Sequence, residues 1–166
     1  APVTGFLFTE KERERTIRRD MTDAFQVPVA FMHRLKKGED FVTPDGEVIA
    51  NCRLTMAPPA VRSYAYMTDT LFRECFAEHV KGVDLLYHES TYGNEFEDLA
   101  KETFHSTAGQ AARMALLAEA KHLLLGHFSS RYPDPTPLLK QAREIFPNTD
   151  LCYDGAVFEL PVAKRG

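Results

Sequence analysis

The chain of 166 residues has the length of one domain or of a large part of one. Hydrophobic residues make up 44% and charged residues 27%, which are globular proportions and exclude wholesale disorder. Twenty Lys and Arg against 24 Asp and Glu give a net charge of -4. This balance argues against a stand-alone nucleic-acid-binding module, which would usually carry a basic stripe. The charge balance is still compatible with an enzyme that contacts RNA through a local basic patch and metal ions.

The cysteine content and the hydropathy pattern indicate the cellular compartment of the protein. Cys52, Cys75 and Cys152 are odd in number and form no C-x-x-C pair, so they indicate free thiols in a reducing compartment. No apolar run approaches the ~20 residues that a transmembrane helix needs, and no secretory signal opens the chain. We therefore expect a cytoplasmic protein that does not partner a membrane.

The first 60 residues are polar and rich in turns, and we expect them to carry little core. Residues 5–10 are typical of a strand, and the charged stretch 11–20 of a solvated helix or arm. A short helix over 31–38 would end at Gly38. A Pro-Asp-Gly turn at 44–46 predicts a hairpin between two short strands at 41–43 and 47–49.

From residue 61 the pattern alternates between strand and helix, which predicts an α/β layer architecture. Thr107 and Gln110 have the spacing of a capping box. The expected strands are 63–67, 84–88, 122–128, 151–153 and 157–160, and the expected helices are 71–80, 96–103, 107–120 and 136–145.

Polar clusters follow three of these strands directly, where functional groups of α/β proteins gather. They are Thr-Asp-Thr at 68–70, His-Glu-Ser-Thr at 88–91 and His-Phe-Ser-Ser-Arg-Tyr at 127–132. A fourth cluster, Phe-His-Ser-Thr at 104–107, precedes a helix, whose free N–H groups would favour an anion. The four clusters predict one rim built from convergent groups.

Carboxylate and imidazole are common zinc ligands, and Asp69 and His127 suit that role. Glu89 and His105 could instead form a proton-transfer pair. Taken singly, each residue also has a structural interpretation: Asp69 as a helix cap, Glu89 as a loop acid and His105 as a neighbour of a helix cap. The histidines at 33, 79 and 122 are interpreted as structural or surface residues.

Together, four segments resemble, in this order, the later motifs of ribonuclease Z, the tRNA 3′-end endonuclease of the metallo-β-lactamase fold. They are YMTDT at 66–70, HEST at 88–91, FHST at 104–107 followed by QAA at 110–112, and GHFSSRY at 126–132. The closing Phe-Pro at 146–147 and Tyr-Asp at 153–154 are also similar. The resemblance covers nearly the whole chain.

The resemblance implies a role for each matching residue. Asp69 would bridge two zinc ions, and His127 would be a late ligand to one of them. Glu89 and His105 would protonate the leaving 3′-oxygen. Ser129, Ser130 and Arg131 would orient the phosphate or the loop that holds His127.

Two departures from the family pattern affect these expectations. A Gly-Pro-rich arm signature is replaced by VPVAF at 27–31, and no His-x-His-x-Asp-His motif is present. That motif supplies most of the zinc ligands in the family, so the chain resembles a C-terminal half. Residues 1–60 would be the substrate-binding arm and its flanks, and 61–166 the C-terminal half of an αββα sandwich, a mixed sheet with helices on one face.

The resemblance implies part of a zinc-dependent endoribonuclease that acts on precursor tRNA. The isolated chain would be inactive, because the half with most of the ligands is missing. Its inner sheet face would be exposed, which predicts a homodimer. The alternatives are another phosphodiesterase or hydrolase of this fold, and a non-catalytic fragment that dimerises or binds RNA.

Overall fold

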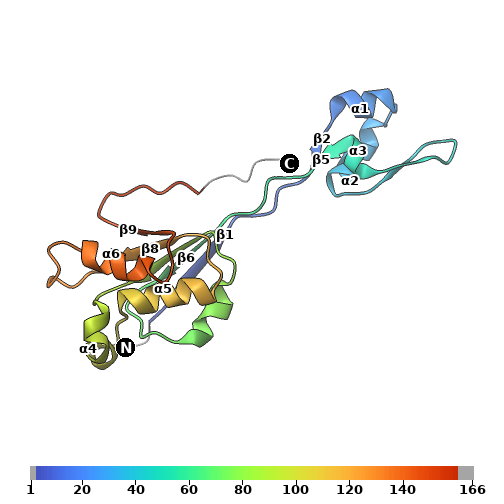
Figure 1. The fold of residues 1–166 in the computed structure, drawn as a ribbon. Helices are drawn as coiled ribbons and strands as arrows, with labels where there is room; N and C mark the ends of the chain where they lie inside the picture. The colour runs from blue at the N-terminus through green and yellow to red at the C-terminus, as the bar shows by residue number, and fades with distance from the viewer. Residues whose placement is uncertain (1–2, 161–166) are drawn as a thin grey trace. The chain divides into compact units, whose positions relative to one another are not determined.

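The computed structural model describes residues 3–160, and these form two compact units (Figure 1). Residues 3–10 and 62–160 form the first, called the sheet unit below. Residues 11–61 form the second, called the insert unit. The change in sequence character near residue 61 thus coincides with the end of the insert unit, whereas residues 3–10 join the sheet unit. No helix within 3–160 is long and apolar enough to cross a membrane.

The sheet unit is built on five strands in the order β1-β6-β7-β8-β9. β1 is antiparallel to β6, whereas β6, β7, β8 and β9 are parallel to one another, so the sheet is mixed. The strands are β1 (Phe6–Thr9), β6 (Ser63–Met67), β7 (Leu85–Glu89), β8 (Leu123–Gly126) and β9 (Thr149–Leu151).

Helices pack on one face of this sheet, where α5 contacts the two central strands β7 and β8 and lies beside α6 (Figure 1). The buried side of α5 consists of small residues, among them Ala108, Ala111, Ala112 and Ala115. Short side chains let the helix approach the leucines of the central strands closely. The helical elements of this unit are η2 (Glu74–Val80), η3 (Asn94–Phe96), α4 (Glu97–Thr103), α5 (Ala108–Leu117) and α6 (Thr136–Arg143).

The opposite face of the sheet carries rings, and we call it the aromatic face: Phe6, Phe8, Tyr64, Tyr66 and Tyr87. Cross-strand register pairs Phe6 with Tyr66, Phe8 with Tyr64 and Tyr66 with Tyr87, which places all five side chains on one side. The rings of Tyr66 and Tyr87 stack with centroids 4.7 Å apart. Phe6 and Phe8 remain 52% and 57% exposed, so the apolar side chains of this face are only partly buried.

The insert unit has a small core of its own, contrary to the expectation that the first 60 residues carry little. Asn51 explains part of this order: it is buried and its Nδ2 donates to the carbonyl oxygens of Leu35 and Glu39, each at 2.8 Å. These hydrogen bonds satisfy a polar group that would otherwise be costly to bury. The core residues are Val27, Leu35, Phe41, Ile49 and Leu54.

The expected short helix and hairpin of the insert unit are confirmed. Gly38 follows the helix with φ at 96°, a conformation that favours glycine. The elements are β2 (Thr16–Ile17), α1 (Arg19–Ala24), η1 (Val29–Phe31), α2 (Met32–Lys36), β3 (Phe41–Val42), β4 (Val48–Ile49), α3 (Asn51–Leu54) and β5 (Thr55–Met56), with β2 paired to β5 and β3 to β4.

One sequence-based prediction of an element in the sheet unit is confirmed only in part, and another is wrong. The segment expected as a helix over 71–80 is a 3₁₀ helix that begins only at Glu74, which is common in short connectors. The strand expected over 157–160 does not form, because residues 157–160 pair with no strand in the described part of the chain. Its β-branched and aromatic composition would suit a strand, but it meets no free sheet edge. The other expected strands and helices of this unit form, with shifts of a few residues at their ends.

Candidate active site

Three site residues converge at one edge of the sheet. Because β6, β7 and β8 are parallel, their carboxyl ends meet there; Asp69 lies two residues after the end of β6, and His127 follows β8 directly. The turn between α4 and α5 brings His105 to the same place. One possible ligand atom from each of Asp69, His105 and His127 lies within 4.8 Å of the others.

Backbone strain gathers at this cluster. Asp69, Phe104 and His127 have φ values of 49°, 62° and 57°, in the left-handed region that non-glycine residues seldom adopt. Only two other non-glycine residues within 3–160 share this region. Each such conformation costs on the order of 1–3 kcal/mol and typically persists at functional sites.

The carboxylate of Glu89 organises the cluster from within the protein, where the side chain is fully buried. Its oxygens accept hydrogen bonds from Thr70 N at 2.7 Å, Thr91 Oγ1 at 2.6 Å and Ser106 N at 3.1 Å. His105 Nδ1 lies 3.0 Å from Glu89 Oε1. An ionised carboxylate only accepts, so Nδ1 carries the hydrogen and Nε2 of His105 is left for chemistry.

The loop that carries Asp69 is held from both sides. Its neighbour Thr70 donates its N–H to Glu89, and its carbonyl oxygen accepts from Ser106 Oγ at 2.6 Å. The N–H group and the carbonyl group of Thr70 are therefore both held by hydrogen bonds. This arrangement aims the carboxylate of Asp69 at His127, whose Nε2 lies 3.2 Å from Asp69 Oδ1.

The donor set of this cluster fits a divalent metal ion. One carboxylate and two imidazoles are ligands that zinc and related transition metals accept. Asp69 and His127 are half-exposed, with 53% and 41% of their side chains accessible, so an ion could reach them. The Glu89 contact fixes the His105 ring, in the way that outer partners orient metal-site histidines.

The start of α5 is not the free anion site that the sequence suggested. Its first N–H groups are already used: Ala108 N donates to Tyr92 O at 2.9 Å and Gly109 N donates to Asn94 Oδ1 at 2.8 Å. Gln110 N donates to Thr107 Oγ1, which completes the predicted capping box. Because capping satisfies these donors, that expectation is wrong.

The loop after His127 forms a turn over the end of β7. Ser129 N donates to Thr91 O at 3.0 Å, and Arg131 N donates to Ser129 Oγ at 3.4 Å. Ser130 and Arg131 are exposed. The Arg131 guanidinium lies 5.5 Å from the ring centroid of Phe96. The structure thus places this loop beside the cluster, with one cation at its surface.

Three further histidines, at 33, 79 and 122, are not members of the cluster. His33 and His79 are exposed, and His122 contacts Asp150 at 2.9 Å. Sequence reasoning missed the polar partners Thr91 and Ser106, although both lie inside the quoted motifs. The available signal for Thr91 was its hydroxyl group two residues after Glu89, which is buried.

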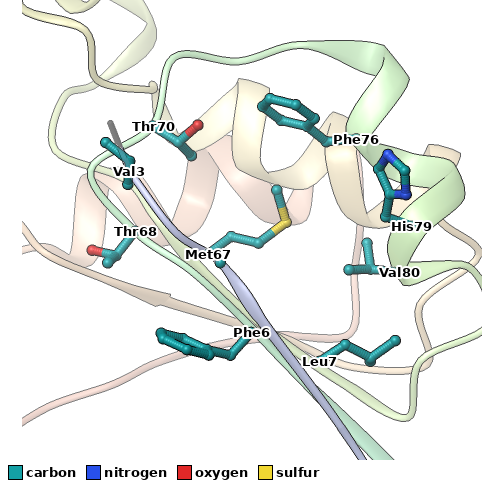
Figure 2. Close-up of a pocket in the computed structure, with 10 residues that line it drawn as sticks. Val3, Phe6, Leu7, Met67, Thr68, Thr70, Phe76, His79 and Val80 are labelled. Carbon is teal, nitrogen blue, oxygen red and sulfur yellow. The ribbon is translucent and has the colours of Figure 1, made fainter. Parts of the chain in front are cut away.

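The lining of an apolar cavity of about 430 Å³ includes Thr68 and Thr70, the two neighbours of Asp69 in sequence (Figure 2), but none of the three cluster residues. Val3, Phe6, Met67 and Phe76 line it, and His79 is its one titratable lining residue. Such a lining offers no ligand set or proton-transfer pair. The chemistry of the sheet edge therefore belongs to the cluster.

Comparisons with known proteins agree with this geometry. No protein-family model matches the chain. The chain is 51% identical over 159 residues to "Ribonuclease Z" of Bacteroides fragilis strain YCH46, covering 96% of this chain and 52% of the relative. The chain is homologous to ribonuclease Z. A ribonuclease Z of Trichodesmium erythraeum is 39% identical over 163 residues. The chain spans about half the length of the curated ribonuclease Z sequences it matches.

Solved structures give the same fold. The metallo-β-lactamase fold protein YhfI from Bacillus subtilis matches with a TM-score of 0.55 at 19% identity, covering 72% of this chain and 47% of that one. A long-form RNase Z from yeast matches with a TM-score of 0.51 at 27% identity, covering 57% of this chain and 13% of that one. The predicted resemblance to ribonuclease Z and the predicted α/β class, a part of the metallo-β-lactamase fold with a mixed sheet, are confirmed.

Proposed function

We propose that this chain is part of a zinc-dependent endoribonuclease that processes precursor tRNA at its 3′ end by hydrolysing a phosphodiester bond. The observation that carries the proposal is the cluster of Asp69, His105 and His127 beside the buried Glu89. Homology to ribonuclease Z over 96% of the chain supports it. We call the protein that would combine this chain with the remaining half of its relatives the intact protein.

Asp69 and His127 would hold zinc. Zinc lowers the pKa of a coordinated water to about 7 and so makes hydroxide available at neutral pH. His127 presents Nε2 toward Asp69, so both residues offer their lone pairs to the same space. Their partial exposure leaves that space open to a phosphodiester.

His105 would donate the proton to the leaving oxygen from Nε2. Its Nδ1–H is held by Glu89, and a carboxylate partner stabilises the imidazolium that must exist before the proton is given up. Glu89 keeps the ring oriented through the reaction, because its other contacts are to fixed groups of Thr70 and Ser106. After transfer, His105 returns as a neutral base.

The loop after His127 and the insert unit would bind the RNA. Arg131 is exposed beside the cluster and could pair with a phosphate, while Ser129 and Ser130 would shape the loop. In the insert unit, Arg19 and Lys37 are exposed. Such side chains can neutralise backbone phosphates without reading sequence. This unit would serve as the substrate-binding arm.

The test is cleavage by the intact protein of a precursor tRNA and of a chromogenic phosphodiester. We expect efficient cleavage of the tRNA at its 3′ side and weak turnover of the small diester. The reverse preference would favour another phosphodiesterase of this fold. Failure to cut either, with metal bound, would favour a non-catalytic fragment that dimerises or binds RNA.

The role of His105 has its own test in the intact protein. His105→Ala should lower turnover by ~10²–10⁴-fold, the usual worth of general acid catalysis, and leave zinc content unchanged. His79→Ala, which replaces an exposed histidine that is not a member of the cluster, is the matched control. Loss of zinc in His105→Ala would reassign this residue as a metal ligand.

A further inference from the structure

We propose that Thr91 is a positioning residue, which fixes the tautomer of His127 so that its Nε2 lone pair faces the metal site. The purpose of this tautomer, metal binding, rests on the proposed function. The tautomer itself is inferred from two contacts of one hydroxyl group. Thr91 Oγ1 lies 2.6 Å from Glu89 Oε2 and 2.9 Å from His127 Nδ1.

The hydroxyl has a single hydrogen, and this decides the direction of both bonds. The carboxylate of Glu89 is the nearer acceptor and the charged one, so the hydrogen goes to Glu89. Thr91 can then only accept from His127, which requires Nδ1 to carry the ring hydrogen. In the neutral ring, Nε2 is left with a lone pair.

That lone pair points at another acceptor. His127 Nε2 lies 3.2 Å from Asp69 Oδ1, and two acceptors at this distance repel unless a cation lies between or beside them. A second hydrogen on the ring or a bound metal ion would supply that cation. Thr91 therefore prepares His127 and Asp69 as a pair of ligands.

The same carboxylate joins the two halves of the site. Glu89 accepts from His105 Nδ1 directly and from His127 through Thr91. Both rings are thus held with Nδ1 toward the protein, and their centroids lie 5.2 Å apart. Thr91 thus orients His127, the proposed ligand, in the same way as Glu89 orients His105, the proposed acid.

The first measurement needs no substitution. Long-range ¹H–¹⁵N correlation spectra of the metal-free chain, recorded above the ordinary titration range of imidazole, report which ring nitrogen of His127 carries hydrogen. We expect Nδ1–H in the wild type. A neutral His127 with hydrogen on Nε2 would overturn the proposal.

Variants then test whether Thr91 is the cause. Thr91→Val keeps the shape but removes the hydroxyl, so we expect hydrogen to move to Nε2, where Asp69 can accept it. Thr91→Ser should restore the wild-type pattern. Ser90→Ala is the matched control, because its hydroxyl contacts the Gly126 carbonyl and not His127. An unchanged tautomer in Thr91→Val, or no restoration in Thr91→Ser, would refute the role.

Zinc titration followed through the His127 signals gives a second readout besides activity. Loss of an outer partner of a metal ligand typically weakens metal binding by ~10–100-fold, and we expect a shift of this size for Thr91→Val but not for Thr91→Ser. Equal affinities in wild type and Thr91→Val would contradict the proposal. A correct tautomer in a protein that cuts no RNA would instead refute the proposed function alone.

Discussion

Two adjacent buried residues, His88 and Glu89, differ sharply in how their polar atoms are satisfied. Glu89 receives four donor groups, whereas His88 makes one hydrogen bond, from Nδ1 to Glu89 O at 2.7 Å. Its Nε2 is buried without a hydrogen-bond partner among the described residues. Burial lowers the pKa of His88, because the charged ring would lose its hydration. His88 is thus held neutral in the fold.

This gives a pH-dependent stability. The unfolded chain takes up a proton at His88 near the ordinary pKa of 6.5, while the folded chain does so only at lower pH. The unfolded state therefore binds more protons below pH 6.5, and the free energy of unfolding falls as pH drops through that value. Urea unfolding at a series of pH values should show this loss.

His88→Leu is the variant that isolates the effect. It should be less stable than wild type at neutral pH, because the bond to the Glu89 carbonyl is lost. Its free energy of unfolding should fall less steeply below pH 6.5. Parallel pH profiles for the two proteins would rule out His88 as the source.

At the scale of elements, the end of β8 is shaped by a ring from β7. Gly126 closes β8, and the Tyr87 ring lies so close that an added Cβ would meet Tyr87 Cζ at 2.6 Å. The next residue is His127, with its strained backbone. A side chain at position 126 would therefore displace the ring or the end of β8, next to His127.

Gly126→Ala should force Tyr87 aside and destabilise the fold by about 1–3 kcal/mol, as overpacking commonly does. Chemical unfolding followed by circular dichroism measures the loss. Its control is a double-mutant cycle with Tyr87→Ala, in which the cost of Gly126→Ala should shrink. An equal cost in both backgrounds would mean that the ring contact is not responsible.

At the scale of the whole molecule, the candidate metal cluster has fewer ligands than tight binding would need. Asp69, His105 and His127 are the only grouping of three or more possible ligands within residues 3–160. Structural zinc sites usually use four protein ligands, and one of these three is assigned to proton transfer. The rest of the intact protein would have to complete the site.

We therefore expect the isolated chain to retain less than one zinc ion per molecule after dialysis. Elemental analysis measures this directly. The intact protein, purified in the same way, is the control and should retain zinc. Two tightly held zinc ions on the isolated chain would show that half the relatives' length suffices for the site.

The aromatic face leaves apolar side chains uncovered, which predicts that the isolated chain uses a partner surface. Phe6 and Phe8 are more than half exposed, and exposed apolar area costs about 25 cal/mol per Å². We expect the isolated chain to form a homodimer through this face or to bind a hydrophobic dye as a loosely packed monomer. Light scattering and dye fluorescence distinguish the two outcomes.

Phe6→Ser combined with Phe8→Ser should weaken the dimer or reduce dye binding. The matched control is Val29→Ser in the insert unit, which removes an exposed apolar side chain elsewhere. A monodisperse wild-type monomer that unfolds cooperatively and binds no dye would show that the chain is self-sufficient.

Several features could be predicted from the sequence alone: the alternation of strands and helices after residue 61, the capping box at Thr107 and the polar clusters that carry Asp69, Glu89, His105 and His127. These features follow from local periodicity and spacing, which act within a few residues. The short strand predicted at 157–160 and the first residues of the helix predicted over 71–80 were wrong for the same reason. Local composition does not show whether a sheet edge or a helical connection is available.

The contacts within the cluster could not be predicted from the sequence. The contacts of Glu89 with His105 and of Thr91 with His127 join residues 16 and 36 positions apart. The pairing of β1 with β6 spans the whole insert unit. Such contacts depend on strand register and on left-handed backbone at three positions. They arise because the parallel strands end at one edge, where a single buried carboxylate can hold groups from several separate segments.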